Sequence, residues 1–158
     1  MFDFNDLQKE IIDFLKTYLN DESINIIKAF PNEKSSFPLE KRTITVGIFS
    51  IENKQISLGN VLNDNQNIYG AKVKISLDVF CSKYCGGADA LNRIVNDVFN
   101  TMLKKNDLIF PISLNFEKIK YDRDKMLFSC HGQMEAEIVY NDNKLFDQLE
   151  NINITIDI

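Results

Sequence analysis

Apolar residues recur every three or four positions in two parts of the chain, residues 3–20 and residues 88–105. The first part carries Phe4, Leu7, Ile11, Phe14, Leu15 and Leu19 at this spacing. The second carries Leu91, Ile94, Val95, Val98, Phe99, Met102 and Leu103. Such spacing puts the apolar side chains on one side of a helix, so it predicts two amphipathic helices. In the second helix, Asp89 near the start and Lys104 and Lys105 near the end suit the helix dipole.

Apolar and polar residues alternate in two other segments, residues 69–80 and 126–140. In the first, one face carries Ala71, Val73, Ile75, Leu77 and Val79, and the other carries Lys72, Lys74, Ser76 and Asp78. In the second, one face carries Met126, Phe128, Cys130, Gly132, Met134, Ala136, Ile138 and Tyr140. This alternation is typical of antiparallel strands with one face on the core and one in water. Shorter alternations predict strands at residues 24–30, 43–48 and 112–116.

Local signals predict bends and breaks between these elements. Segment 126–140 is longer than the about 3–10 residues that strands usually span, so we predict either an unusually long strand or a strand with a β-bulge, at Gly132. Residues 86–87, both glycine, predict a tight turn from a strand into the second helix. Pro111 is expected to end the helical region, and residues 121–124 predict a turn.

Polar and irregular segments complete the chain. Residues 31–41 predict a loop, and residues 52–68 predict a weakly ordered stretch with a short strand near residues 56–58. Near the C-terminus, a short helical piece at residues 145–149 precedes an alternating, isoleucine-rich tail at residues 152–158.

The elements follow the order helix, strands, helix, strands, with no internal repeat and no linker. We therefore predict an α+β fold, an antiparallel-rich sheet with two helices packed on one face. A length of 158 residues suits one domain, 1–158, with a core of about residues 1–140 and a C-terminal extension at 141–158. The long strands and the apolar tail offer edges that suit pairing with another subunit.

Composition narrows the classes of function. The chain has 18 Lys and Arg residues and 23 Asp and Glu residues, a net charge of −5, and no basic stripe, so no nucleic-acid binding is expected. The N-terminus lacks the pattern of a secretion signal, and the apolar stretch 108–116 is far too short to span a bilayer. We therefore expect a cytoplasmic protein without membrane contact, whose three cysteines are reduced thiols.

Cys81, Cys85, Cys130 and His131 are the residues that could suggest a metal site. Cys130 and His131 are neighbours on one predicted strand, so their side chains point to opposite faces. The spacing of Cys81 and Cys85 is by itself weak support for zinc. We predict no metal site and no cofactor.

The sequence also shows no clear set of catalytic residues. His131 is the only histidine, on the polar face beside Ser129 and Gln133, and no acidic residue is evident that would orient a Ser–His pair. We interpret it as a solvated or interface residue. No phosphate-binding loop accompanies it, and the glycines at 86–87 are explained more simply by a turn than by a phosphate cradle.

Two carboxylate patterns leave one enzymatic alternative. Glu135 and Glu137 share a strand face, and Glu52 and Lys54, with Glu40 upstream, have the spacing of one class of metal-dependent nucleases. Such patterns arise readily in a chain rich in Glu and Lys, and a nuclease would need a basic surface. We therefore predict that the protein is not an enzyme, and that it has no catalytic residues.

The order and local character of the elements provide a family resemblance. Within residues 69–105, a strand that ends Leu77-Asp78-Val79-Phe80 leads through a glycine turn into the helix Ala90-Leu91-Asn92-Arg93-Ile94-Val95-Asn96-Asp97-Val98-Phe99. The strand Ile112-Ser113-Leu114-Asn115-Phe116, the turn Tyr121-Asp122-Arg123-Asp124 and the long final strand follow. With the N-terminal helix, residues 1–140 resemble the tail-terminator proteins of phage tails and phage-tail-like bacteriocins.

This resemblance implies a structural subunit without enzymatic activity that forms a homohexameric ring. The ring would cap the tail tube, halt tube polymerisation and offer a surface to neck or head-completion proteins and, in contractile tails, to the sheath. The protein would then be cytoplasmic during assembly and part of the virion or phage-tail-like particle. We expect the long final strand and the loop at residues 31–41 to make these contacts.

Two alternatives remain open at this point. One is a head-completion or neck protein of the same particle. The other is a small-ligand-binding regulatory domain with a pocket between the helices and the sheet.

Overall fold

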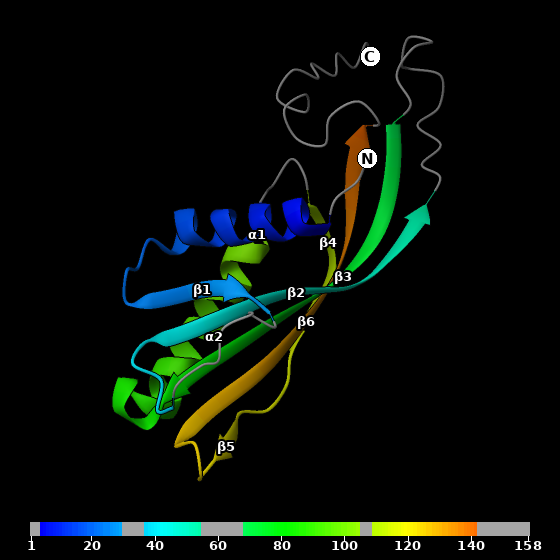
Figure 1. The fold of residues 1–158 in the computed structure, drawn as a ribbon. Helices are drawn as coiled ribbons and strands as arrows, with labels where there is room; N and C mark the ends of the chain where they lie inside the picture. Colours follow the sequence, from blue (N-terminus) through cyan, green and yellow to red (C-terminus); the bar gives the residue numbers. More distant parts are fainter. Residues whose placement is uncertain (1–3, 30–36, 55–67, 105–108, 142–158) are drawn as a thin grey trace.

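The structure is a computed structural model that describes residues 4–29, 37–54, 68–104 and 109–141. Its elements are, in order, α1 (Phe4–Leu19), β1 (Ile24–Lys28), β2 (Arg42–Lys54), β3 (Ile68–Ser82), the short 3₁₀ helix η1 (Lys83–Cys85), α2 (Gly87–Met102), β4 (Ile109–Phe116), β5 (Lys120–Asp122) and β6 (Leu127–Asn141). The two helices and the mostly antiparallel six-stranded sheet confirm the predicted α+β fold (Figure 1).

The strands lie in the order β1-β2-β3-β6-β4, and β5 pairs with the beginning of β6. The β1–β2 pair is parallel and the other pairs are antiparallel. The β3–β6 ladder is continuous from Ile68 opposite Asn141 to Ser82 opposite Leu127. It forms the centre of the sheet, and Figure 1 shows β2, β3 and β6 running on past the helices at one end.

Both helices pack on the same face of the sheet. α1 contacts β1 and β2, α2 contacts β3 and β6, and the helices contact each other. The strand residues buried beneath them include Ile26, Ile44, Val46, Ala71, Val73, Ile75, Leu77, Val79, Met134, Ala136 and Ile138. The helices contribute Leu7, Ile11, Leu15, Leu91, Ile94 and Val98. Each Leu or Ile side chain buried in this way contributes about 1.5–3 kcal/mol relative to an exposed one, so this layer stabilises the fold.

Of the two alternatives for segment 126–140, the long strand is confirmed and the β-bulge at Gly132 is wrong, because β6 spans 15 residues and keeps a regular register with β3 throughout. The register shifts instead at Phe49 in β2 and at Ile112 in β4. Gly132 has a different reason to be glycine. A Cβ atom there would lie 2.4 Å from Cε1 of Phe116 and 2.5 Å from the carbonyl oxygen of Leu77, so only glycine leaves room for both neighbours.

Two other boundaries differ from expectation. Pro111 lies inside β4, which begins at Ile109, and an edge strand tolerates a residue without an N–H. Tyr121 belongs to the short strand β5, and the turn comes later, where Asp122 Oδ1 accepts hydrogen bonds from the backbone N–H groups of Asp124 and Lys125. The turn therefore begins later in the chain than predicted, and the side chain of Asp122 stabilises it.

The turn predicted at residues 86–87 is confirmed. Gly86 and Gly87 have φ values of 106° and 62°, a conformation that glycine adopts without strain. They connect η1 to α2, whose first turn contains Asp89 as predicted. A Cβ atom on Gly86 would also lie 2.7 Å from Cβ of Ala90.

Some predicted features lie outside the described residues. These are residues 31–36 of the loop, the short strand near 56–58, the helical piece at 145–149 and the tail at 152–158. Within the described parts of the chain, no helix combines the length and the apolar character needed to cross a membrane.

The contact between Gly132 and Phe116 leads to a stability prediction. Alanine normally stabilises a strand relative to glycine, but here its methyl group would collide with a ring and with the backbone of β3. We expect Gly132→Ala to lower the free energy of unfolding by about 1–3 kcal/mol, the usual cost of overpacking. Chemical denaturation checks this. The matched control is Gln133→Ala at the exposed neighbouring position, which should change stability by less than about 0.5 kcal/mol. An unchanged Gly132→Ala variant would contradict the packing described.

Candidate functional site

The face of the sheet opposite to the helices carries polar side chains in rows across the strands. One row contains Thr45, Asp78 and His131, from β2, β3 and β6. The next rows towards the end of β2 contain Gly47, Ser76, Gln133 and Asn115, then Ser50, Lys74, Glu135 and Ser113, then Glu52, Lys72, Glu137 and Phe110. Apart from the buried Gly47 and the apolar Phe110, this face is therefore a polar, partly to fully exposed surface built from four strands.

Opposite charges on this face are paired with one another. Lys72 Nζ lies 2.9 Å from Glu135 Oε2, and Lys74 Nζ lies 3.6 Å from Glu135 Oε1. The hydrogen bond from Lys72 holds the pKa of Glu135 below its ordinary value, and the same contact raises the pKa of Lys72. Glu52 and Glu137 stand opposite Lys72 on its two flanking strands and raise its pKa further. Glu135 is thus paired with both lysines, while Glu52 and Glu137 add negative charge on either side of Lys72.

These contacts bear on the carboxylate patterns seen in the sequence. Glu135 and Glu137 do share a face, but Glu135 is held by two lysines in the ionised form, which does not suit a proton donor. Glu40 precedes β2, and Glu52 lies near the end of that strand. At roughly 3.3 Å per strand residue, the two glutamates are about 30 Å apart. The structure therefore does not bring Glu40 and Glu52 together as metal ligands.

His131 has a carboxylate partner that the sequence did not reveal. Its Nδ1 contacts Oδ1 of Asp78, which lies directly opposite on β3. The expectation that no acidic residue orients the ring is therefore wrong, because strand register brings together residues that are 53 positions apart. No hydroxyl group of the described residues is hydrogen-bonded to the ring, so a Ser–His–Asp arrangement is not assembled there. The pair cross-links β3 and β6 on the exposed face.

The cysteines and His131 are separated as predicted. Cys130 is buried on the helix side of β6, whereas the His131 side chain is 43% exposed on the polar side. The thiols donate to backbone carbonyl groups: Cys81 to Cys85, Cys85 to Leu39 and Glu40, and Cys130 to Glu117. Among the residues that the structure describes, no three His, Cys, Asp or Glu side chains gather in a way that could hold a metal ion.

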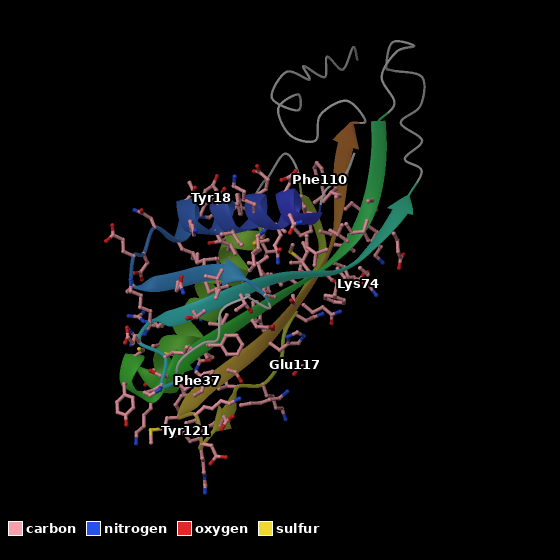
Figure 2. The ribbon with its side chains drawn as sticks, in the orientation of Figure 1. Tyr18, Phe37, Lys74, Phe110, Glu117 and Tyr121 are labelled. Atoms are coloured by element: carbon pink, nitrogen blue, oxygen red, sulfur yellow. The ribbon has the colours of Figure 1, made fainter. Side chains whose placement is uncertain are left out.

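A patch of exposed apolar side chains lies at the end of the sheet where β6 begins. Tyr84 is 69% exposed and its hydroxyl lies 3.2 Å from the sulfur of Met126. Tyr121 stacks on Phe128, and Lys125 lies over the ring of Phe37. Figure 2 shows Phe37 and Tyr121 at this end. Phe37 belongs to the part of the predicted contact loop that the structure describes. Sequence periodicity did not identify the patch, because its residues come from several short and separate elements.

The described strands leave outer sides unpaired at both margins of the sheet, that of β4 at one margin and those of β1 and of the end of β2 at the other. β4 is the last strand on one side, and we call its outer side, residues 109–116, the β4 edge. On the other side β1 covers β2 only as far as Val46. We call the outer side of residues 48–54 the β2 edge, because no described residue pairs with it. Open edges of this kind are templates for pairing with another chain.

Burial of the thiols leads to a reactivity prediction. Burial raises the pKa values of Cys81 and Cys130, which disfavours the reactive thiolate, whereas Cys85 is only half-buried. In the native protein we expect alkylation of Cys81 and Cys130 to be slower than that of Cys85 by about an order of magnitude. Peptide mass spectrometry after timed alkylation measures this, with urea-unfolded protein as the control in which all three react alike. Equal native rates would contradict the described burial.

The ion pair at Glu135 leads to a pH prediction. A pKa held below the ordinary value of 4.5 means that the paired carboxylate stabilises the fold above that pH, and that this contribution is lost as the pH falls through the lowered pKa. Glu135→Gln should therefore be less stable than the unmodified protein at neutral pH, and the two should converge on acidification. Denaturation at a series of pH values tests this. In a Lys72→Met background the effect of Glu135→Gln should shrink, and a difference independent of pH would contradict the pairing.

Comparison with known proteins gives little further guidance. No known protein family matches the sequence, and no curated protein matches it. Among solved structures, the chain is similar to a chain from the virion of a native gene transfer agent particle. The TM-score is 0.43 and the sequence identity 11%, over 84% of this chain and 94% of that chain. At this TM-score the likeness is too weak to support an inference about function.

Proposed function

We propose that this protein is a ring-forming structural subunit of a phage or phage-tail-like particle, with the role of tail terminator. The observation that carries the proposal is the pair of open, unlike edges on opposite sides of one sheet. The resemblance of residues 1–140 to tail-terminator proteins supplies the specific role. The confirmed α+β fold, with both helices on one face, agrees with what that resemblance implies.

Unlike edges favour head-to-tail assembly. A two-fold dimer uses the same surface on both subunits, whereas two different surfaces on opposite sides let each copy bind the next. Such heterologous contacts close into a ring when the rotation from copy to copy divides a full turn. The ring that the resemblance implies is hexameric, and closing it through these two edges would cover them in every copy.

The polar face suits a structural role better than a chemical one. Lys72, Lys74 and Glu135 are committed to one another, and Asp78 is committed to His131. The side chains in these pairs satisfy one another, which disfavours a role for them in binding a substrate. We therefore propose that the protein is not an enzyme and that it acts by capping the tail tube. Its partners would be the tube protein and, at other surfaces, sheath, neck or head-completion proteins.

The first test is the state of assembly. We expect size-exclusion chromatography with light scattering to give a multiple of the 18.2 kDa chain, sixfold for a hexamer, at high protein concentration. Negative-stain electron microscopy should then show rings. A strict monomer over the whole concentration range, without rings by microscopy, would contradict the proposal.

The same experiment can be extended to separate the terminator from a head-completion protein. Added to a polymerising preparation of the particle's tube protein, a terminator ring should shorten the tubes and be found at one tube end. A head-completion ring should leave the tube length unchanged. The control is an equal amount of unfolded protein.

A further inference from the structure

We infer that neighbouring copies join through their sheets: the β4 edge of one copy pairs, antiparallel, with the β2 edge of the next. The inference rests on the proposed function, since it names the surface by which the ring closes. The partner at each edge is a second copy of this chain, because the properties of the two edges complement each other.

The β2 edge begins where the cover of β1 ends. The carbonyl oxygen of Val46 is the last group on this side with described partners, the N–H of Ala29 at 2.7 Å and the side-chain amide of Gln8 at 2.5 Å. Beyond it, residues 48–54 pair with β3 on their inner side and with no described residue on their outer side. Phe49, the bulge residue on this edge, is 54% exposed.

The β4 edge lacks charged side chains, although it carries two other features that limit pairing, Pro111 and the bulge at Ile112. Natural edge strands are blunted by charged side chains, yet residues 109–116 include no charged residue. Phe110 and Ile112 are 47% and 53% exposed, and Figure 2 shows Phe110 beside the upper part of the sheet. Pro111 has no N–H to donate, so pairing with a neighbour would run mainly over residues 112–116. A strand without charges can lie against Glu52 without like-charge repulsion.

The direction of the strands makes the two edges complementary. β2 and β6 run one way and β3 and β4 run the other, because each neighbouring pair from β2 to β4 is antiparallel. A rotation that carries one copy beside the next, about an axis roughly along the strands, preserves these directions. β4 of one copy and β2 of the next are then antiparallel, the pairing that continues the alternation of the sheet.

The two edges also bend at the same level. Ser50 in β2 is opposite Lys74, Lys74 is opposite Glu135, and Glu135 is opposite Ser113 in β4. The bulge residues Phe49 and Ile112 are immediate neighbours of these two serines. A bulge bends and twists its strand, so both edges change direction beside the same row of the sheet. Edges that match in direction, length and bend within one chain favour a second copy as the occupant.

Disulfide trapping tests this contact. Opposite residues in an antiparallel pair have Cβ atoms about 4.5–5.5 Å apart, so cysteines in the row shared by Ser50 and Ser113 can be oxidised across the junction. We expect the double variant Ser50→Cys/Ser113→Cys to give a ladder of covalent multimers on non-reducing gels after mild oxidation. Each single variant should stay at the background of the unmodified protein, whose own three cysteines provide the baseline. The matched control is Ser113→Cys/Asn92→Cys, with the second cysteine on an exposed position of α2.

The outcomes separate this inference from the proposed function. If light scattering shows rings but the double variant gives no ladder, the inference is overturned and the ring stands. If Ser113→Cys alone gives dimers, the β4 edges pair with each other, which also overturns it. A strict monomer contradicts the ring and the junction together.

A second variant tests the same edge without a new covalent bond. Ile112→Lys places a charge at the exposed bulge of β4, and we expect it to weaken assembly at least tenfold while the melting temperature of the subunit is unchanged. Tyr84→Lys, at a similarly exposed apolar position away from both edges, should leave assembly intact. Equal assembly of both variants would overturn the inference.

Discussion

The ladder between β3 and β6 is the constraint on which the rest of the structure depends. It is the longest unbroken pairing in the described chain, and it fixes which side of each strand faces the helices. A shift of one residue would turn every side chain of a strand to the other face, exposing Met134 and burying Glu135. The same register places Asp78 against His131 and brings the backbone of Leu77 against Gly132. The core, the polar face and the close packing at Gly132 therefore depend on the same register.

Much of this could be predicted from the sequence, because helical and strand periodicity record which face is buried. The two helices, the long strands and the separation of Cys130 from His131 follow from that periodicity. The Asp78–His131 pair does not, since it depends on register between strands that are far apart in the chain. The bulges were not predicted for a related reason, because a bulge depends on how two strands pair. The sequence alone could not show that the glycine at position 132 makes room for Phe116, since Phe116 lies on another strand. Local sequence signals describe a strand's faces, but not which residue lies opposite.

The exposed surface has two different characters, and this difference is what gives the fold its proposed role. Across the middle of the polar face, lysines and glutamates satisfy one another, so that surface is well solvated and self-contained. At the margins, the outer backbone groups of the β2 and β4 edges pair with no described strand, and the side chains of Phe49, Phe110 and Ile112 are exposed. Association through the margins would bury apolar area and leave the solvated middle unchanged. A surface organised in this way suits a component of a larger particle.

The two bulges have a geometrical consequence for any assembly built on this sheet. One inserted residue in each outer strand, beside a common row, sets the local twist and so the angle between one margin and the other. In a closed ring that angle, multiplied by the number of copies, must equal one full revolution. The number of copies in the ring would then depend on the twist that two single-residue insertions, Phe49 and Ile112, give to the sheet.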